Sequence, residues 1–97
     1  MEIIYGQNCS GKTKQLIEKS LKEDTPILVF SPMKASSLEE KSIVYFNQKV
    51  KTLYYTDLGD YSGKVLIDDL DKNLDFIIKL ALDNCKIGVD AITLSSN

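Results

Sequence analysis

The chain opens with Glu2-Ile3-Ile4-Tyr5-Gly6-Gln7-Asn8-Cys9-Ser10-Gly11-Lys12-Thr13, and this stretch decides the fold. Its apolar start predicts a strand over about residues 2–5. From Gly11 to Glu23 a helix is expected, because Leu16, Ile17 and Leu21 recur at the three-to-four spacing of one helix face. Between the two, residues 6–13 match the pattern G-x-x-x-x-G-K-[ST] at every fixed position. The sequence therefore predicts a strand that passes through a glycine-bounded loop directly into a helix.

The residue types in this loop suit a polyphosphate ligand. Backbone N–H groups of such a loop and the positive end of the helix after it attract anions. Lys12 adds a mobile positive charge, and the Thr13 hydroxyl is a ligand for Mg²⁺. Gly6 and Gly11 permit backbone angles and a close approach that a side chain would block. The residues expected to bind a nucleotide are Gly6, Gln7, Asn8, Cys9, Ser10, Gly11, Lys12 and Thr13. The alternative is a glycine-rich turn without a ligand.

Composition limits the remaining choices. With 97 residues, the chain is expected to form a single domain over residues 1–97. Its net charge is −2 and its lysines are scattered, which does not support nucleic-acid binding. No arginine is present, so an arginine that accelerates phosphate transfer cannot come from this chain. Histidine is absent and Cys9 and Cys85 are the two cysteines, so neither a zinc site nor a disulfide framework is predicted. No segment resembles a signal peptide or a membrane span, and we expect a cytoplasmic location without membrane contact.

A second chemical feature is the apolar run over residues 65–67, which ends in Asp68 and Asp69. In open α/β sheets, ligands bind beyond the carboxyl ends of the strands. We therefore expect Asp68 near the glycine-bounded loop, where a carboxylate can hold Mg²⁺. Asp69 adds a second carboxylate one residue further along the chain. The alternative for this acidic run is a cap for the next helix.

The remaining elements follow from the same patterns. They are a strand over residues 26–31, a helix from Ser36 to about Asn47 or Gln48, a strand over residues 51–56, a helix from about Asp71 to Gly88 and a strand over residues 91–94. Pro32 is expected to end the second strand, and two overlapping Ser-x-x-Glu boxes favour the helix start at Ser36. In the third helix, a core stripe is predicted at Leu74, Ile77, Ile78, Ala81, Leu82 and Cys85.

Three tyrosines leave two interpretations open. Tyr54, Tyr55 and Tyr61 suit the walls of a base-binding site, and they equally suit a strand and its packing. Asn97, after the last strand, suits either a polar site residue or part of a frayed chain end.

Together these residues resemble a P-loop NTPase, in the division with an additional strand between the loop strand and the Walker B strand, which includes the AAA+ and RecA-like ATPases. Residues 65–69 resemble the Walker B element. The resemblance implies a three-layer α/β/α fold with a mostly parallel sheet of about five strands. It also implies that Lys12 contacts the β and γ phosphates and that Thr13 and Asp68 hold Mg²⁺. By the same resemblance, Asp69 activates the attacking water, and Asn97 or Ser96 is the polar residue that senses the γ-phosphate. The chain departs from the pattern in its lack of arginine, in Lys64, and in an aspartate where a glutamate is usual. On this resemblance we expect either a minimal ATP-binding domain or a domain derived from a longer ATPase.

We expect ATP and Mg²⁺ as ligands and slow or partner-stimulated ATP hydrolysis, with Lys12 and Asp69 as the catalytic residues. One alternative is a nucleoside or small-molecule kinase, because the loop followed by Pro32-Met33-Lys34 is loosely similar to thymidine kinases. Another alternative is a non-catalytic module whose partner binding is gated by nucleotide. A sheet that stops early leaves an open edge strand, which favours pairing with a second copy or with another protein.

Overall fold

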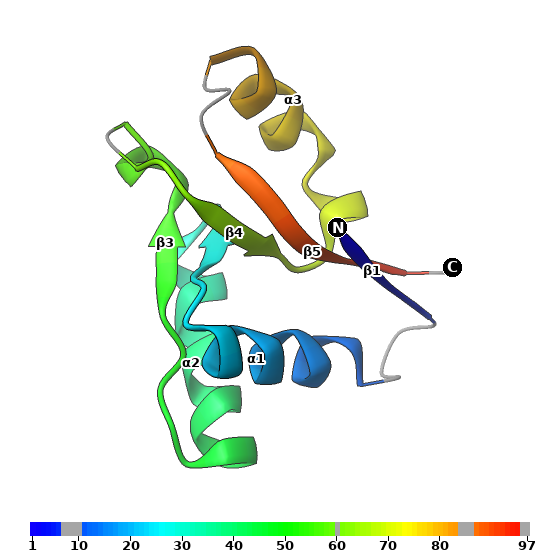
Figure 1. Cartoon of the computed structure of the whole chain (residues 1–97), viewed down its shortest axis with the longest axis vertical. Helices are drawn as coiled ribbons and strands as arrows, with labels where there is room; N and C mark the ends of the chain where they lie inside the picture. The colour runs from blue at the N-terminus through cyan, green and yellow to red at the C-terminus, as the bar shows by residue number, and fades with distance from the viewer. Residues whose placement is uncertain (7–10, 60, 84–86, 96–97) are drawn as a thin grey trace.

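Five strands form one parallel sheet in the order β1-β5-β4-β2-β3 (Figure 1). The computed structural model describes residues 1–6, 11–59, 61–83 and 87–95. The elements in chain order are β1 (Glu2–Gly6), α1 (Lys12–Glu23), β2 (Ile27–Val29), α2 (Pro32–Phe46), β3 (Thr52–Tyr54), the 3₁₀ turn η1 (Tyr55–Asp57), β4 (Lys64–Ile67), the 3₁₀ turn η2 (Leu70–Lys72), α3 (Leu74–Asp83) and β5 (Gly88–Ser95). The predicted α/β class with a parallel sheet of about five strands is confirmed.

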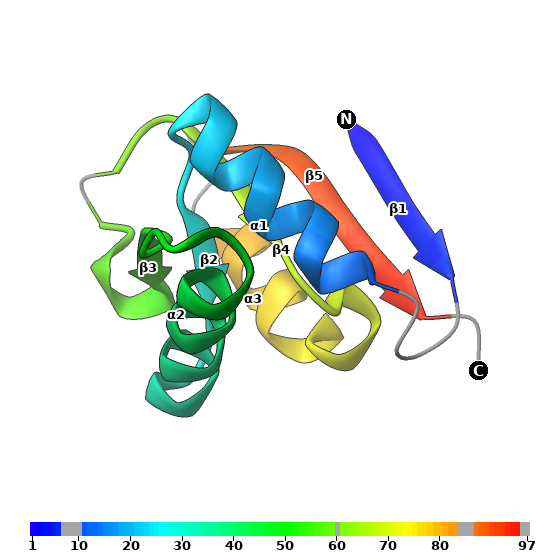
Figure 2. The ribbon, with the colours of Figure 1, turned by 90° about the horizontal axis from the view of Figure 1, so that it is seen from below.

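The sheet is covered by helices on both faces. Figure 2 shows α1 and α2 on one face, and α3 lies on the other. Because successive strand residues point to opposite faces, Leu66 of β4 packs in the core under α1 and α2, whereas Val65 and Ile67 pack in the core on the α3 side. Leu16 and Ile17 of α1 are fully buried in the first of these two cores. Strands with apolar residues on both faces are typical of parallel sheets.

The parallel direction brings the important chain segments to one edge of the sheet. β1 ends at Gly6, directly before the glycine-bounded loop, and β4 ends directly before Asp68. β5, which carries Ile92 and Thr93, lies between these two strands and runs parallel to both. Gly6 and both aspartates therefore lie at the carboxyl ends of strands, at the same edge of the sheet.

The start of α2 corrects the sequence prediction. The helix begins at Pro32, not at Ser36, because the Ser31 hydroxyl accepts a hydrogen bond from the Lys34 backbone N–H at 3.1 Å and Pro32 occupies the first turn. A serine cap followed by proline is a strong helix start, since proline lacks the N–H that the first turn leaves unpaired. This earlier start places Lys34 in the first turn of the helix, above the carboxyl end of the sheet.

Smaller differences concern the strand and helix limits. The second and third strands are shorter than predicted, and the third is followed by η1. The third helix starts at Leu74 after η2, and the predicted core stripe is wrong for Leu74 and Ile78, which are 53% and 57% exposed. Ile77 does pack against the core. Cys85 lies outside the described residues, and the side chains of residues 81 and 82 are not described.

β1 is an edge strand of the described sheet, and it carries exposed apolar side chains. Ile3 and Tyr5 are 54% and 66% exposed, although Ile4 between them is buried against α1 and α2. Among residues 1–6, 11–59, 61–83 and 87–95, each helix is too short or too polar to cross a lipid bilayer.

Candidate functional site

The two chemical motifs of the sequence meet at the carboxyl edge of the sheet. The Thr13 hydroxyl, at the amino-terminal end of α1, donates to the Asp68 carboxylate, with Oγ1 3.1 Å from Oδ2 and 3.3 Å from Oδ1. These residues are 55 positions apart in the chain. Asp68 is only 3% exposed, so its carboxylate depends on protein partners for hydrogen bonds.

Thr93 of β5 fixes the position of both aspartates. Its hydroxyl donates to Asp68 Oδ1 at 2.7 Å and accepts the backbone N–H of Asp69 at 2.6 Å. Thr93 is fully buried. Sequence reasoning did not single out this residue, although the signal was present as a polar side chain inside the apolar run Ala91-Ile92-Thr93-Leu94. A buried hydroxyl that bonds to an ionised group contributes more than a neutral pair would.

Lys34 is the second residue that the sequence analysis did not assign to the site. Its ammonium Nζ lies 2.7 Å from Asp68 Oδ2 and 3.2 Å from Asp69 Oδ2. Burial alone would lower the pKa of Lys34, but the charges and hydrogen bonds of the two carboxylates outweigh burial and raise this pKa above its ordinary value. Lys34 therefore stays charged and bridges the two aspartates.

Asp69 adopts an unusual backbone conformation. Its φ of 55° and ψ of 50° lie in the left-handed region, which aspartate tolerates better than most residues. Its carbonyl accepts hydrogen bonds from the Lys72 N–H at 2.9 Å and from the Asn73 side-chain amide at 2.9 Å. The chain thus turns sharply after β4, and the Asp69 side chain lines the pocket beside α1.

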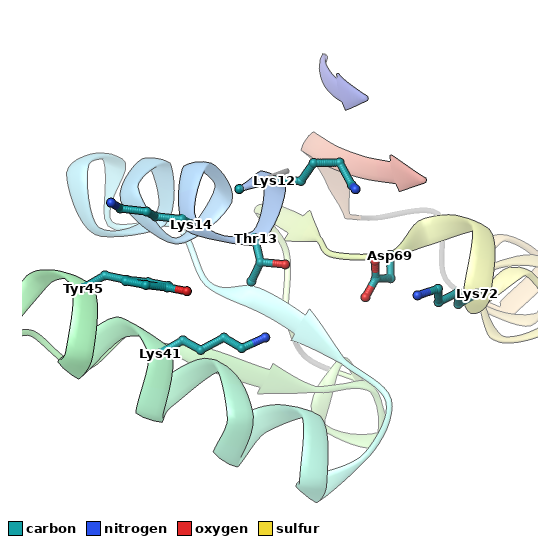
Figure 3. A pocket seen from close by; sticks show the side chains of 8 residues that line it. Lys12, Thr13, Lys14, Lys41, Tyr45, Asp69 and Lys72 are labelled. Carbon is teal, nitrogen blue, oxygen red and sulfur yellow. The ribbon is translucent and has the colours of Figure 1, made fainter. Parts of the chain in front are cut away.

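This pocket has a volume of about 630 Å³ and a strongly positive lining. Lys12, Lys14, Lys41 and Lys72 line it together with Asp69, the one carboxylate among its described lining residues. Figure 3 shows Thr13 and Lys41, from α1 and α2, across the pocket from Asp69 and Lys72. An excess of ammonium groups around a cavity favours an anionic ligand.

The wall of the pocket on the α2 side combines a ring with two cations. Tyr45 and Lys41 both line the pocket from α2, and the Lys14 ammonium lies 5.3 Å from the centre of the Tyr45 ring. This distance fits a cation–π contact. Tyr45 is 45% exposed, so part of its surface remains open to a ligand.

A second pocket of about 380 Å³ adjoins the first and shares Asp69 and Lys72 with it. It lies at the carboxyl ends of β2 and β4, and Lys34 and Asp68 contribute to its lining. Its apolar wall includes Phe76, whose ring stacks on Phe30 with the ring centres 5.1 Å apart.

The predicted site residues fall into two groups. Gly6, Gly11, Lys12, Thr13, Asp68 and Asp69 lie in the described residues, whereas Gln7, Asn8, Cys9, Ser10, Ser96 and Asn97 lie outside them. Gly11 has a φ of 86°, a conformation that favours glycine. Lys12 is 7% exposed, which is unusually buried for a lysine.

The three tyrosines that suited either a base-binding site or strand packing all pack against a core. Tyr54 packs against the core under α1 and α2, and Tyr55 and Tyr61 pack against the core on the α3 side. The Tyr61 hydroxyl also donates to the Lys64 carbonyl at 2.7 Å. Tyr45, which the sequence analysis did not consider, is the tyrosine that lines the positively charged pocket.

The oxygen atoms of Thr13 and Asp68 suit the chemistry of Mg²⁺. In nucleotide sites this ion uses one or two carboxylates, with phosphates and waters as its other ligands. One hydroxyl and one buried carboxylate in direct contact, beside a cationic pocket, fit that pattern. Within the described residues, no group of three or more His, Cys, Asp or Glu side chains is placed to hold a metal by itself.

Comparison of the chain with protein-family models, with curated proteins and with solved structures finds no match in any of the three.

Proposed function

We propose that this protein binds a nucleoside triphosphate together with Mg²⁺ and hydrolyses it slowly or when a partner stimulates it. ATP is the nucleotide that we propose. The observation that carries the proposal is the hydrogen bond between Thr13 and Asp68, because it joins the predicted phosphate loop to the predicted metal carboxylate. Thr13 lines the first pocket and Asp68 lines the second pocket that adjoins it. The lysines that line the first pocket support a polyphosphate ligand.

The strand order adds support from the backbone. β5 separates β1, which leads into the glycine-bounded loop, from β4, which leads into Asp68. This is the arrangement implied by the resemblance to NTPases that carry an additional strand between those two. The arrangement also explains how Thr93 of β5 reaches the aspartates after β4.

In the proposed reaction, the chain's own residues bind and orient the reactants. Lys12, at the start of α1, contributes positive charge to the phosphates, and the helix end contributes its dipole. Bound Mg²⁺ would be held by Thr13 and Asp68 and would neutralise phosphate charge. Water attacks the γ-phosphorus, the bond to the β-phosphate oxygen breaks, and the proton of the water passes to the Asp69 carboxylate.

The rate is expected to be low for a structural reason. Positioned positive charges supply most of the acceleration in such sites, and this chain has lysines but no arginine. An ammonium group acts as a single point charge, whereas a guanidinium group holds two phosphate oxygens in fixed geometry. A partner protein that supplies an arginine would therefore raise the rate. A cytoplasmic location, where ATP and Mg²⁺ are abundant, belongs to the same proposal.

Calorimetric titration with ATP, GTP and ADP, each with and without Mg²⁺, tests the proposal. Lys12→Ala should weaken ATP binding by about tenfold to a hundredfold, the range for a lost hydrogen bond to a charged group. Lys49→Ala is the matched control, because Lys49 pairs with Glu39 at 3.5 Å and does not line either pocket. Absence of ATP binding by the wild type, or equal binding by both variants, contradicts the proposal.

Release of inorganic phosphate tests the enzymatic part separately. The wild type should release phosphate from ATP slowly, and Asp69→Asn should release less while it binds ATP equally well, because an amide does not accept the proton. If ATP is bound but no phosphate is released with any partner offered, hydrolysis is excluded and a nucleotide-gated binding module remains.

A further inference from the structure

The ammonium group of Lys34 lies against Asp68, at the place where the proposed nucleotide site would hold Mg²⁺. Its Nζ lies 2.7 Å from Asp68 Oδ2, and the Asp68 side chain is 1% exposed. Both Asp68 oxygens are engaged, because Oδ1 accepts from Thr93 and Oδ2 faces Lys34 while Thr13 lies near both. A metal-bound water would require the Oδ2 position that the ammonium holds.

The two neighbouring carboxylates explain why a cation is present. Asp68 and Asp69 follow each other in the chain, and both direct an Oδ2 atom at the same Nζ, at 2.7 and 3.2 Å. The Asp68 side chain is 1% exposed and the Asp69 side chain is 25% exposed, so water screens the repulsion between their negative charges only in part, and a positive charge between them offsets it. In the described residues, Lys34 is the one lysine with an ion pair to Asp68.

The surroundings of Lys34 leave it room to move. Its side chain is 28% exposed, and it lines the second pocket of about 380 Å³. Its backbone is held by the Ser31 cap, so the flexible four-carbon chain is the part that can swing into this pocket. The ammonium can thus leave the carboxylates without unfolding of α2.

We propose that Lys34 is a built-in cation that holds Asp68 and Asp69 in the nucleotide-free protein and that Mg²⁺ must displace it. This inference rests on the proposed function and adds a regulatory contact to the same site. Its consequence is that Mg²⁺ alone binds poorly to the wild type, because the ion must compete with an attached ammonium group. Mg²⁺ enters with the nucleotide, whose phosphates add the negative charge that favours the metal over lysine.

Thermal unfolding during a MgCl₂ titration without nucleotide tests this proposal. Lys34→Gln keeps a side chain that can donate a hydrogen bond but removes the charge, so it leaves the buried Asp68 carboxylate and the partly exposed Asp69 carboxylate without this cation. We expect this variant to unfold at a lower temperature than the wild type in the absence of Mg²⁺. MgCl₂ should restore its stability with a half-point at least about tenfold below that of the wild type, since a unit charge at contact distance exceeds the energy of a tenfold change.

Two further variants separate displacement from a purely structural ion pair. Lys34→Arg keeps the cation and should respond to MgCl₂ like the wild type. Lys49→Gln removes the exposed lysine that pairs with Glu39 and should show no change in its response. If Lys34→Gln is folded and responds to MgCl₂ like the wild type, the proposal is overturned.

The outcome is decisive even when Lys34→Gln does not fold by itself. Refolding in MgCl₂ but not in its absence supports the proposal, because the metal then replaces the ammonium. Failure to fold in both conditions overturns it. Since no nucleotide is present, the result is independent of ATP binding. A failure of the proposed function would appear in the calorimetric titration or in the phosphate-release assay.

Discussion

Replacing Thr93 with valine tests whether the buried hydroxyl organises the aspartates. Valine has nearly the same shape, so the fully buried site on β5 stays filled. The substitution removes the donor to Asp68 Oδ1 at 2.7 Å and the acceptor of the Asp69 N–H at 2.6 Å. It therefore isolates hydrogen bonding from packing.

The expected loss follows from these two contacts. An unpaired buried N–H costs about 1–3 kcal/mol, and a hydrogen bond to a charged group contributes about 1.5–3 kcal/mol. The gained methyl group offsets about 0.8 kcal/mol. Because Thr13 still lies near Asp68 Oδ1 at 3.3 Å, the carboxylate keeps part of its support. We expect Thr93→Val to lower the free energy of unfolding by about 2–4 kcal/mol.

Urea unfolding followed by circular dichroism measures this change. For a slope near 2 kcal/mol per molar urea, the midpoint of Thr93→Val should fall by about 1–2 M. Thr93→Ser is the matched control, because it keeps the hydroxyl and loses one buried methyl group, at about 1 kcal/mol. If Thr93→Val is as stable as Thr93→Ser or more stable, the hydroxyl does not organise the site and the reasoning fails.

Three further predictions concern the elements around the site. Gly11→Ala places a side chain at a φ of 86°, and the left-handed strain of about 1–2 kcal/mol should lower the melting temperature modestly and weaken ATP binding in calorimetry. Ser31→Ala removes the cap of α2, so the free energy of unfolding should fall by about 1 kcal/mol and the melting temperature by about 4–8 °C. Ser36→Ala, inside the same helix, should be neutral or slightly stabilising. If both variants lower the melting temperature equally, the cap at Ser31 is wrong and the predicted helix start at Ser36 is favoured. The exposed edge of β1, with Ile3 and Tyr5, should pair with a second copy, so light scattering at high concentration should give twice the mass of one chain and Ile3→Lys should halve it. A wild-type mass of one chain at every concentration argues against this pairing.

The sequence predicts the parts of the fold that depend on local patterns. Continuous apolar runs such as residues 65–67 indicate buried parallel strands, and the structure places β4 there. The contact between Thr13 and Asp68 also agrees with the expectation that Asp68 emerges beside the loop, because parallel strands end at one edge.

The remaining features depend on contacts between distant segments. Thr93 contacts the aspartates because β5 lies beside β4. A polar residue inside an apolar run marks Thr93 as unusual, but it does not indicate that the partner lies 25 residues away. The sequence analysis predicted that α2 starts at Ser36, which left Lys34 outside the helix, because Ser36 and Ser37 offered a capping pattern as good as the one used at Ser31. Local propensity cannot choose between competing caps when packing of the helix against the sheet decides.

The central claim is that Thr13 and Asp68 share one Mg²⁺ beside a pocket for phosphates, and Thr13→Val tests it most directly. Valine fills the same space without the hydroxyl. Calorimetric titration with ATP should show that Mg²⁺ strengthens binding to the wild type by about tenfold or more, and that Thr13→Val loses this gain while it still binds ATP without metal. An ATP affinity that Mg²⁺ changes equally in both proteins, or does not change in the wild type, would contradict the claim.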